Sequence, residues 1–189
     1  MVATMRAMNW DQLTDHVVTA ATKAFRALMA EKPDEHFYAF ALYTDEFAET
    51  VVPSANSIER YEEKVRNIGA TEDIASYKWS TAEWAYEAKF GELFKPVYSE
   101  LKIYRANSLK SDADYAPYKQ AVHKCMIAAL KRMDENGFFV KARENITLFI
   151  SSSDDDEAFE LENYSAKQLN AKECYLSFLQ RYGNNAVAP

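Results

Sequence analysis

The chain has few of the residue types from which recognisable catalytic and cofactor motifs are built. Its 189 residues include only 4 glycines, 2 cysteines and 3 histidines. With so little glycine, the sequence contains neither the G-x-G-x-x-G turn of dinucleotide-binding domains nor the Walker phosphate loop. The G-x-S-x-G turn that presents a serine nucleophile is also missing. These absences exclude the common glycine-dependent nucleotide and hydrolase motifs.

The histidines and cysteines are too scattered to form a spacing motif. His16, His36 and His123 fall on separate predicted elements and make no H-E-x-x-H or H-x-x-x-H pair. Cys125 and Cys174 lack C-x-x-C spacing and both fall in predicted helices, so we expect free, buried thiols in a reducing compartment. We therefore predict no metal and no cofactor, although a metal site assembled from distant residues stays open.

Long apolar runs and basic runs are also missing. No stretch is long enough to cross a bilayer, and the first six residues lack the apolar core of a signal peptide, so we predict a cytoplasmic protein. Acidic side chains outnumber basic ones by 29 to 22, which gives a formal charge of −7. This field disfavours nucleic acid and anionic membranes as direct partners, and a basic protein fits better.

The residues that are present indicate one well-packed domain. Hydrophobic residues make up 48% of the chain and aromatic residues 14%, and no repeat or flexible linker divides it. We expect a single α+β domain over residues 1–189, with frayed ends in the first few residues and after residue 184.

Hydrophobic periodicity places the main elements. Apolar residues recur at helical spacing from Trp10 to Leu28, while residues 36–44 are apolar on both alternating faces, as in a central strand covered on both sides. Residues 146–151 form a second predicted strand, and Thr50–Val52 an antiparallel neighbour stopped by Pro53. Further helices are expected at 58–68, from 80, around 90–101, at 111–136 and at 170–182, and residues 159–162 fit a strand or a helix. The predicted fold is a small, mostly antiparallel sheet packed against several helices.

Four polar pairs have the spacing of a helix N-cap and its third helical residue. They are Asn56 with Glu59, Ser80 with Glu83, Ser111 with Asp114, and Asn170 with Glu173. In the second pair, Trp79 and Trp84 flank the capping box at the positions of a hydrophobic staple. The tryptophans are therefore predicted to be core residues. With Tyr86 nearby, the alternative is an exposed aromatic platform for a partner or ligand.

Carboxylates follow two of the predicted strands. Asp45 and Glu46 come after the first, and Asp154, Asp155, Asp156 and Glu157 after the second. If these strands are parallel neighbours, both groups leave the same edge of the sheet and form an acidic rim that steers a basic partner. The alternative is that the two turns lie at opposite ends and are simply solvated. An acid/base pair among these residues, Glu83 and Glu87 also stays open.

Three segments resemble a known family. They are the strand from His36 to Asp45, the turn Pro53-Ser54-Ala55-Asn56-Ser57, and the motif from Tyr77 to Trp84. Together with Ile146–Asp154 and Leu169-Asn170, they resemble the bacterial domain of unknown function 4303. The resemblance covers most of the chain and implies no catalytic residues. For function it implies toxin immunity, the neutralisation of a secreted bacterial toxin by direct binding.

The leading hypothesis is a non-enzymatic, cytoplasmic protein-binding domain, of the immunity-protein kind, with a basic, toxin-like partner. Its candidate contact residues are Asp45, Glu46, Trp79, Trp84, Tyr86, Asp154, Asp155 and Asp156. One alternative is a hydrolase-like enzyme with a carboxylate site built in space, and another is a small-ligand module that uses the Trp/Tyr cluster. Convergent carboxylates with raised pKa values in a cleft favour the enzyme, and exposed aromatics beside acidic groups favour the binder.

Overall fold

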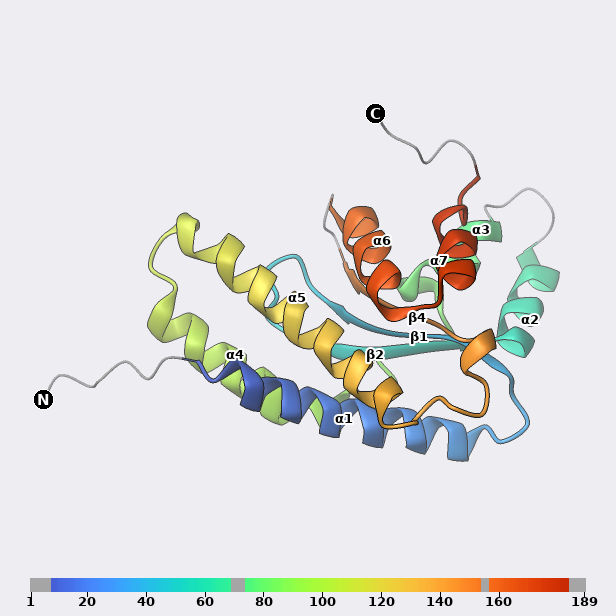
Figure 1. Cartoon of the computed structure of the whole chain (residues 1–189), viewed down its shortest axis with the longest axis horizontal. Coiled ribbons are helices and arrows are strands. Elements are labelled where there is room, and N and C mark those ends of the chain that lie inside the picture. The colour runs from blue at the N-terminus through green and yellow to red at the C-terminus, as the bar shows by residue number, and fades with distance from the viewer. Residues whose placement is uncertain (1–7, 69–73, 154–156, 184–189) are drawn as a thin grey trace, which may run out of the picture.

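A four-stranded mixed sheet forms the centre of the protein (Figure 1). The computed structural model describes residues 8–68, 74–153 and 157–183. The strand order is β3-β2-β1-β4, with β1 at Phe37–Thr44, β2 at Val52–Ser57, β3 at Tyr86–Glu87 and β4 at Thr147–Ser152. β2 is antiparallel to β1 and to β3, whereas β4 is parallel to β1. The α+β class is confirmed, and two of the three strand pairings are antiparallel.

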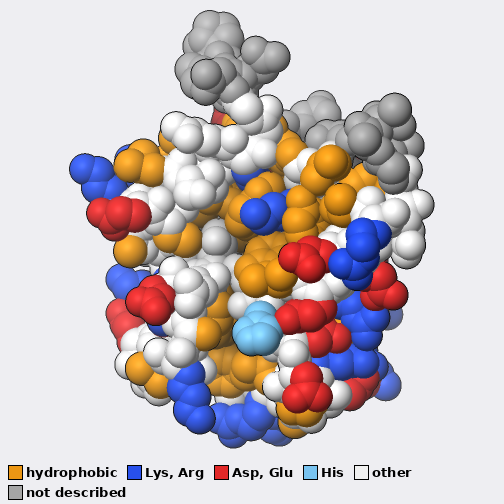
Figure 2. All heavy atoms as spheres, turned by 90° about the vertical axis from the view of Figure 1, so that its right-hand side faces the viewer, with side chains coloured by type: hydrophobic (Ala, Val, Ile, Leu, Met, Phe, Trp, Pro, Cys, Tyr) orange, Lys and Arg blue, Asp and Glu red, His pale blue; other side chains and the backbone are white. Residues whose placement is uncertain are grey.

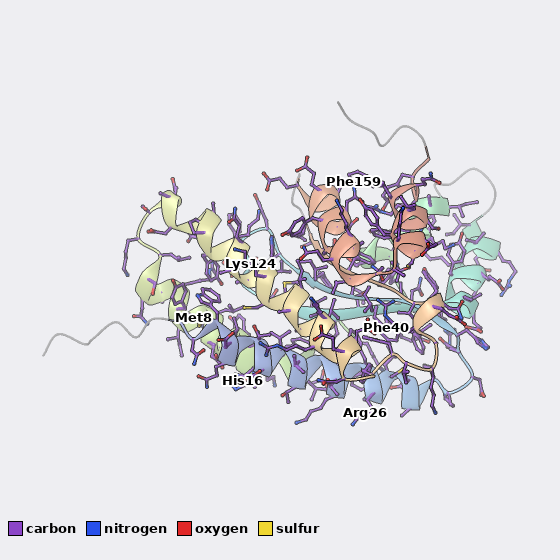
Figure 3. The ribbon with its side chains drawn as sticks, in the orientation of Figure 1. Met8, His16, Arg26, Phe40, Lys124 and Phe159 are labelled. Carbon is purple, nitrogen blue, oxygen red and sulfur yellow. The ribbon has the colours of Figure 1, made fainter. Side chains whose placement is uncertain are left out.

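Three helices cover one face of the sheet: α1 (Trp10–Glu31), α4 (Lys95–Ser108) and α5 (Asp112–Glu135) (Figure 1). The Asn9 side chain caps α1 by accepting a hydrogen bond from the Gln12 backbone N–H at 3.1 Å. Phe40 (labelled in Figure 3), Leu42 and Leu148 pack against these helices from the strands, and all three are completely buried. This layer holds the larger part of the hydrophobic core.

The second face is covered by α6 (Ala158–Leu169), α7 (Lys172–Leu179) and the segment from α3 (Ile74–Trp79) to β3 (Figure 1). Ala39, Ala41 and Phe149 point to this face and pack with Trp84 and Phe178. Helix α2 (Ile58–Ile68) follows β2, and three short 3₁₀ turns complete the described chain: Thr81–Glu83, Gly91–Phe94 and Arg143–Asn145. β1 is therefore covered on both sides, as its continuous apolar pattern predicted.

The helix predicted from Ser80 is wrong. α3 ends at Trp79, and Ser80 begins a single 3₁₀ turn without a side-chain cap. The Glu83 carboxylate accepts instead from Lys64 Nζ at 2.6 Å, so the capping box does not form. A lysine that arrives from α2 offers an ion pair, which the local sequence pattern cannot reveal.

The predictions around β2 are corrected in two ways. The strand begins at Val52 and not at Thr50, and it continues through Pro53, its second residue, to Ser57. Asn56 is buried in the strand, where its amide donates to the Tyr38 hydroxyl at 3.0 Å, so it does not cap α2. Ser57 lies before α2 instead, and its hydroxyl accepts from the Arg60 N–H at 3.3 Å. The cap is therefore one residue later than predicted.

The two remaining caps have opposite outcomes. The Asp114 carboxylate accepts from the Ser111 backbone N–H at 2.8 Å, so the predicted start of α5 is confirmed. Gly137 follows the last turn of α5 with a φ of 75°, a left-handed conformation that glycine adopts without strain. Asn170, predicted to cap the last helix, ends α6 instead, and α7 begins two residues later.

Asn170 closes the open edge of β4. Its side chain accepts from the Leu148 N–H at 2.9 Å and donates to the Leu148 carbonyl at 2.7 Å, as a neighbouring strand does. Two residues along the edge, Ser165 Oγ accepts from the Ile150 N–H at 3.0 Å and lies 3.4 Å from the Ile150 carbonyl oxygen. These side chains occupy the backbone N–H and C=O groups of β4 to which a further strand would have to bind, so β4 is not a surface for strand addition.

Both cysteines are free, Cys125 buried and Cys174 half-buried. Among the helices that the structure describes, none combines the length and the apolar character that crossing a membrane requires.

A candidate partner-binding groove at the carboxyl ends of β1 and β4

The parallel strands β1 and β4 end side by side. Thr44 pairs with Ser152, and the Ser153 N–H donates to the Thr44 carbonyl at 2.8 Å. In sheets with helices on both faces, crevices form beyond the carboxyl ends of parallel strands, where the chain leaves toward different layers. A groove of about 1290 Å³ opens at this edge, between α5, α6 and the loop that joins β1 to β2.

Two helices form the long walls of the groove. From α5 come residues at helical spacing on one side, namely Tyr115, Ala116, Lys119, Gln120, His123, Lys124 and Ile127. Between the first and the last of these, α5 rises about 18 Å at 1.5 Å per residue. The opposite wall consists of Glu160, Leu161 and Tyr164 from α6, with Glu157 just before the helix. Lys124 and the α6 residue Phe159 are labelled in Figure 3 to locate these helices.

The β1–β2 loop forms the third wall and is organised by Asp45. The Asp45 carboxylate accepts hydrogen bonds from the backbone N–H groups of Phe47, Glu49 and Thr50 at 2.9–3.1 Å and from the Thr50 hydroxyl at 2.8 Å. Asp45 was predicted to be part of an acidic rim, but its carboxylate points inward and binds the backbone of its own loop. Glu46 and Phe47 are the loop residues that point outward and are exposed.

The loop is also fastened to the helices beneath it. The Tyr118 hydroxyl of α5 donates to the Ala48 carbonyl at 2.7 Å, and Arg105 of α4 pairs with Glu49 at 2.5 Å. Ala48 is fully buried with a φ of 51°, a left-handed conformation that costs a non-glycine residue roughly 1 kcal/mol. These contacts anchor the loop to α4 and α5 and present Glu46 and Phe47 on a supported frame, which lowers the entropy cost of binding.

Three aromatic side chains are exposed along the groove. Phe47 is 53% exposed, Tyr164 is 59% exposed and Tyr115 is 37% exposed. The rings of Phe47 and Tyr115 meet edge to face with centroids 6.5 Å apart. Partly exposed aromatic rings on a rigid frame are typical anchors of protein interfaces.

Charges of both signs line the groove, with acidic groups in excess. The carboxylates are Glu46, Glu49, Asp112, Glu157 and Glu160, and the cations among the described lining residues are Arg105, Lys119 and Lys124. Arg105 and Glu49 neutralise each other. The two predicted acidic turns therefore leave the sheet at the same edge, and the alternative of opposite ends is wrong: Glu46 and Glu157 line one groove. Asp154, Asp155 and Asp156 lie outside the described residues.

The predicted tryptophan cluster lies on the α6–α7 side of the sheet and does not line the groove. Trp84 is 4% exposed, and its indole N–H donates to the Lys78 carbonyl at 3.0 Å. Trp79 is half-buried and packs edge-on against Tyr38 and Phe178. The structure therefore places Trp84 in the core, with Trp79 packed against it.

Tyr86 is buried at the end of the sheet opposite the groove. Its hydroxyl donates to the Glu35 carboxylate at 2.6–2.7 Å and accepts from Arg60 Nε at 3.2 Å. Burial of the phenol, reinforced by its bond to Glu35, raises the pKa of Tyr86 to about 12. Figure 2 shows this end face-on, with acidic side chains beside basic ones. Tyr86 thus holds β3 to α2 and is not available to a partner.

Among the described residues, four carboxyl groups have clearly shifted pKa values, and none of these four lines the groove. Burial raises the pKa of Glu162 against the opposing influence of Ser151 and Arg181. The pKa values of Glu35 and Glu59 are lowered, because hydrogen bonds outweigh the desolvation that burial brings, and that of Asp114 is lowered by its bonds to the start of α5. Each shift belongs to a structural contact. Within the described ranges, no three His, Cys, Asp or Glu side chains are arranged to hold a metal ion.

The sequence reading missed Phe47, Tyr115 and Tyr164. Phe47 interrupts an otherwise acidic and small-residue loop, Asp45-Glu46-Phe47-Ala48-Glu49, where an apolar ring has no obvious core to join. Tyr164 lies off the buried face of α6, whose buried positions are Glu162, Ser165, Ala166 and Leu169. Both are aromatic residues out of phase with the core pattern, a signal that points to a contact surface.

The fold and the groove define a compact α+β domain with a preformed, aromatic and acidic groove at the carboxyl ends of two parallel strands. The family described as "Domain of unknown function (DUF4303)" matches residues 17–171, and the chain belongs to this family. No curated protein and no solved structure matches the chain.

Proposed function

We propose that this protein is a non-enzymatic binding domain of the cytoplasm that holds a segment of a partner protein in the α5–α6 groove. The observation that carries the proposal is the groove itself, whose loop wall is locked in place and whose aromatic rings are exposed. Its volume of about 1290 Å³ is greater than the 300–1,000 Å³ or so that small-ligand sites usually occupy. An open groove of this size suits a polypeptide segment.

Two further observations favour a binder over an enzyme. In the part of the chain that the structure describes, the carboxyl groups with shifted pKa values belong to structural contacts outside the groove and offer no poised acid/base pair there. Strand addition at β4 is blocked by Asn170 and Ser165, which leaves the helix-walled groove as the better binding mode. The family resemblance suggests the finer form of the proposal, an immunity protein that neutralises a toxin by direct binding.

The test compares capture by the wild type with capture by two matched variants. Tyr164→Arg places a charged side chain in the groove, and Tyr98→Arg makes the same change at a half-exposed tyrosine of α4 away from it. The three proteins are immobilised and incubated with native cytosol and, separately, with the protein encoded next to this gene.

A partner that is held by the wild type and by Tyr98→Arg but lost by Tyr164→Arg supports the proposal. Protection of cells from the neighbouring gene product, abolished by Tyr164→Arg alone, supports the immunity form. Retention of the same partners by all three proteins would show that the groove is not the binding surface.

A further inference from the structure

We infer that the segment held in the groove carries lysine or arginine side chains on the side that faces α6 and the β1–β2 loop. The inference rests on the proposed function and specifies the chemistry of the partner. It follows from how charge and aromatic surface are divided between the walls of the groove.

The described residues that line the groove carry more negative than positive charge. The Arg105–Glu49 contact at 2.5 Å uses one charge of each sign. Among the other described lining residues, the carboxylates are Glu46, Asp112, Glu157 and Glu160, and the cations are Lys119 and Lys124. The whole chain, at −7, adds a field of the same sign, which attracts a cationic partner over a distance of about 10 Å at 0.1 M salt.

The charges are distributed unequally over the walls. Both lysines of the described lining belong to α5, together with Asp112, whereas the charged side chains of the α6 wall are Glu157 and Glu160 and the outward-pointing charge of the loop is Glu46. Glu160 and Tyr164 are four residues apart in α6, so they share one face of the helix, and Glu157 immediately precedes its first residue. An occupant therefore meets carboxylates and an exposed phenol on one side.

Exposed rings beside carboxylates are the chemistry that recognises guanidinium and ammonium groups. A cation can lie over a ring face at up to about 6 Å from its centroid while it donates hydrogen bonds to a carboxylate. The chain already makes this kind of contact, because the Arg181 guanidinium lies 4.0 Å from the ring centroid of Phe178 and is paired with Glu162. In the groove, Tyr164 and Phe47 offer exposed rings and Glu160 and Glu46 the carboxylates.

The test uses three synthetic 15-residue peptides of the same length and leucine content, in which the polar positions are all arginine, all glutamate or all serine. Binding of each fluorescein-labelled peptide is measured by fluorescence anisotropy in 50 mM and 500 mM salt. We expect the arginine peptide to bind at least tenfold more tightly than the other two at low salt, with the preference falling at high salt.

Variants show whether this binding occurs in the groove. Glu160→Lys and Tyr164→Ala should each weaken binding of the arginine peptide at least fivefold. The matched changes Glu135→Lys, at the exposed end of α5, and Tyr98→Ala, on α4, should leave it within twofold. Circular dichroism and thermal unfolding of each variant establish that the fold is intact.

The possible results are distinguishable from failure of the proposed function. Binding of the serine or glutamate peptide that depends on Tyr164 keeps a peptide groove but overturns a cationic occupant. If neither groove substitution weakens binding of the arginine peptide, the binding reflects only the net charge of the protein, and the inference is overturned. The inference is also overturned if none of the three peptides binds. The capture experiment decides separately whether the groove holds a protein at all.

Discussion

Removing the Arg181 guanidinium should destabilise this protein strongly, because it leaves a carboxylate buried without its partner. Arg181 donates to the Glu162 carboxylate at 2.8 Å and to the Asn163 side chain at 2.6 Å, and both members of the ion pair are buried. The guanidinium also lies 4.0 Å and 4.4 Å from the ring centroids of Phe178 and Phe159. The pair thus joins the end of α7 to α6.

The size of the effect follows from desolvation. Breaking one side of a buried pair typically costs about 3–5 kcal/mol, a large part of the roughly 5–15 kcal/mol that stabilises a domain. Arg181→Met keeps an unbranched apolar chain against the rings and removes only the charge and its hydrogen bonds. At a urea dependence of about 2 kcal/mol per molar, the unfolding midpoint should fall by about 1.5–2.5 M.

The pH dependence supplies an independent check. Without Arg181, burial dominates at Glu162, so its pKa rises further above the value of about 4.3 in the unfolded chain. A carboxyl group with a raised pKa binds its proton more tightly in the folded state, and stability is lost as pH rises from the unfolded to the folded pKa. The defect of Arg181→Met should therefore be small near pH 4 and grow toward pH 7.

Urea unfolding is followed by tryptophan fluorescence, because Trp79 packs against Phe178 with ring centroids 5.1 Å apart. Adding Glu162→Gln to Arg181→Met removes the buried charge and should restore more than half of the lost stability. Arg66→Met, at an exposed arginine of α2, serves as the control and should change stability by less than about 0.5 kcal/mol. A small loss in Arg181→Met, or no recovery in the double variant, would refute the argument.

Three further predictions concern the fold. Asn170→Ala leaves two backbone groups of the β4 edge without their partner, so differential scanning calorimetry should show a loss of about 2–3 kcal/mol, and an unchanged midpoint would contradict the edge-closing role. Ser80→Ala should change the free energy of unfolding by less than about 0.5 kcal/mol because Ser80 makes no cap bond, whereas Trp84→Ala should lower it by about 3–5 kcal/mol. Equal losses of the two variants in urea unfolding would show that Ser80 caps a helix after all. Burial opposes ionisation of Glu35, but hydrogen bonds and a neighbouring guanidinium outweigh it and lower its pKa, so its stabilising contribution is present at neutral pH and lost as pH falls through that value. Urea titrations from pH 7 to pH 3 should therefore show Glu35→Gln less stable than the wild type at pH 7 and equal to it in acid. A difference in stability between the two proteins that does not change with pH would contradict this account.

The main helices and strands could be predicted from the sequence because their signals are local. The apolar period of α1 and α5, the two-sided apolar run of β1 and the short apolar strand β4 each record how one segment buries its own side chains. The Ser111–Asp114 cap and the glycine after α5 are local for the same reason, since both partners lie within one helical turn. The family resemblance followed from the same segments and agrees with the match over residues 17–171.

Tertiary structure decided which partner each polar side chain takes. Glu83 and Asn170 both have the spacing of helix caps. Glu83 instead pairs with a lysine from α2, and Asn170 forms hydrogen bonds with the open edge of β4. Charged and edge-closing hydrogen bonds of this kind compete with a local cap, and a segment read alone does not show which distant groups will arrive. Asp45 is the converse case: it was predicted to contact a partner, but its carboxylate accepts hydrogen bonds from the backbone of its own loop.

The sequence by itself determined the main helices, the strands β1 and β4, the burial of β1 on both faces and the presence of carboxylates after these two strands. Only the tertiary structure decided that β4 lies parallel to β1, which brings Glu46 and Glu157 from distant parts of the chain to one edge. The groove belongs to no single segment: α5, α6 and the β1–β2 loop enclose it together, and its exposed rings become neighbours only when the sheet has formed. Hydrophobic periodicity reports what each element buries against the core, whereas a concave surface depends on the space that packed elements leave between them.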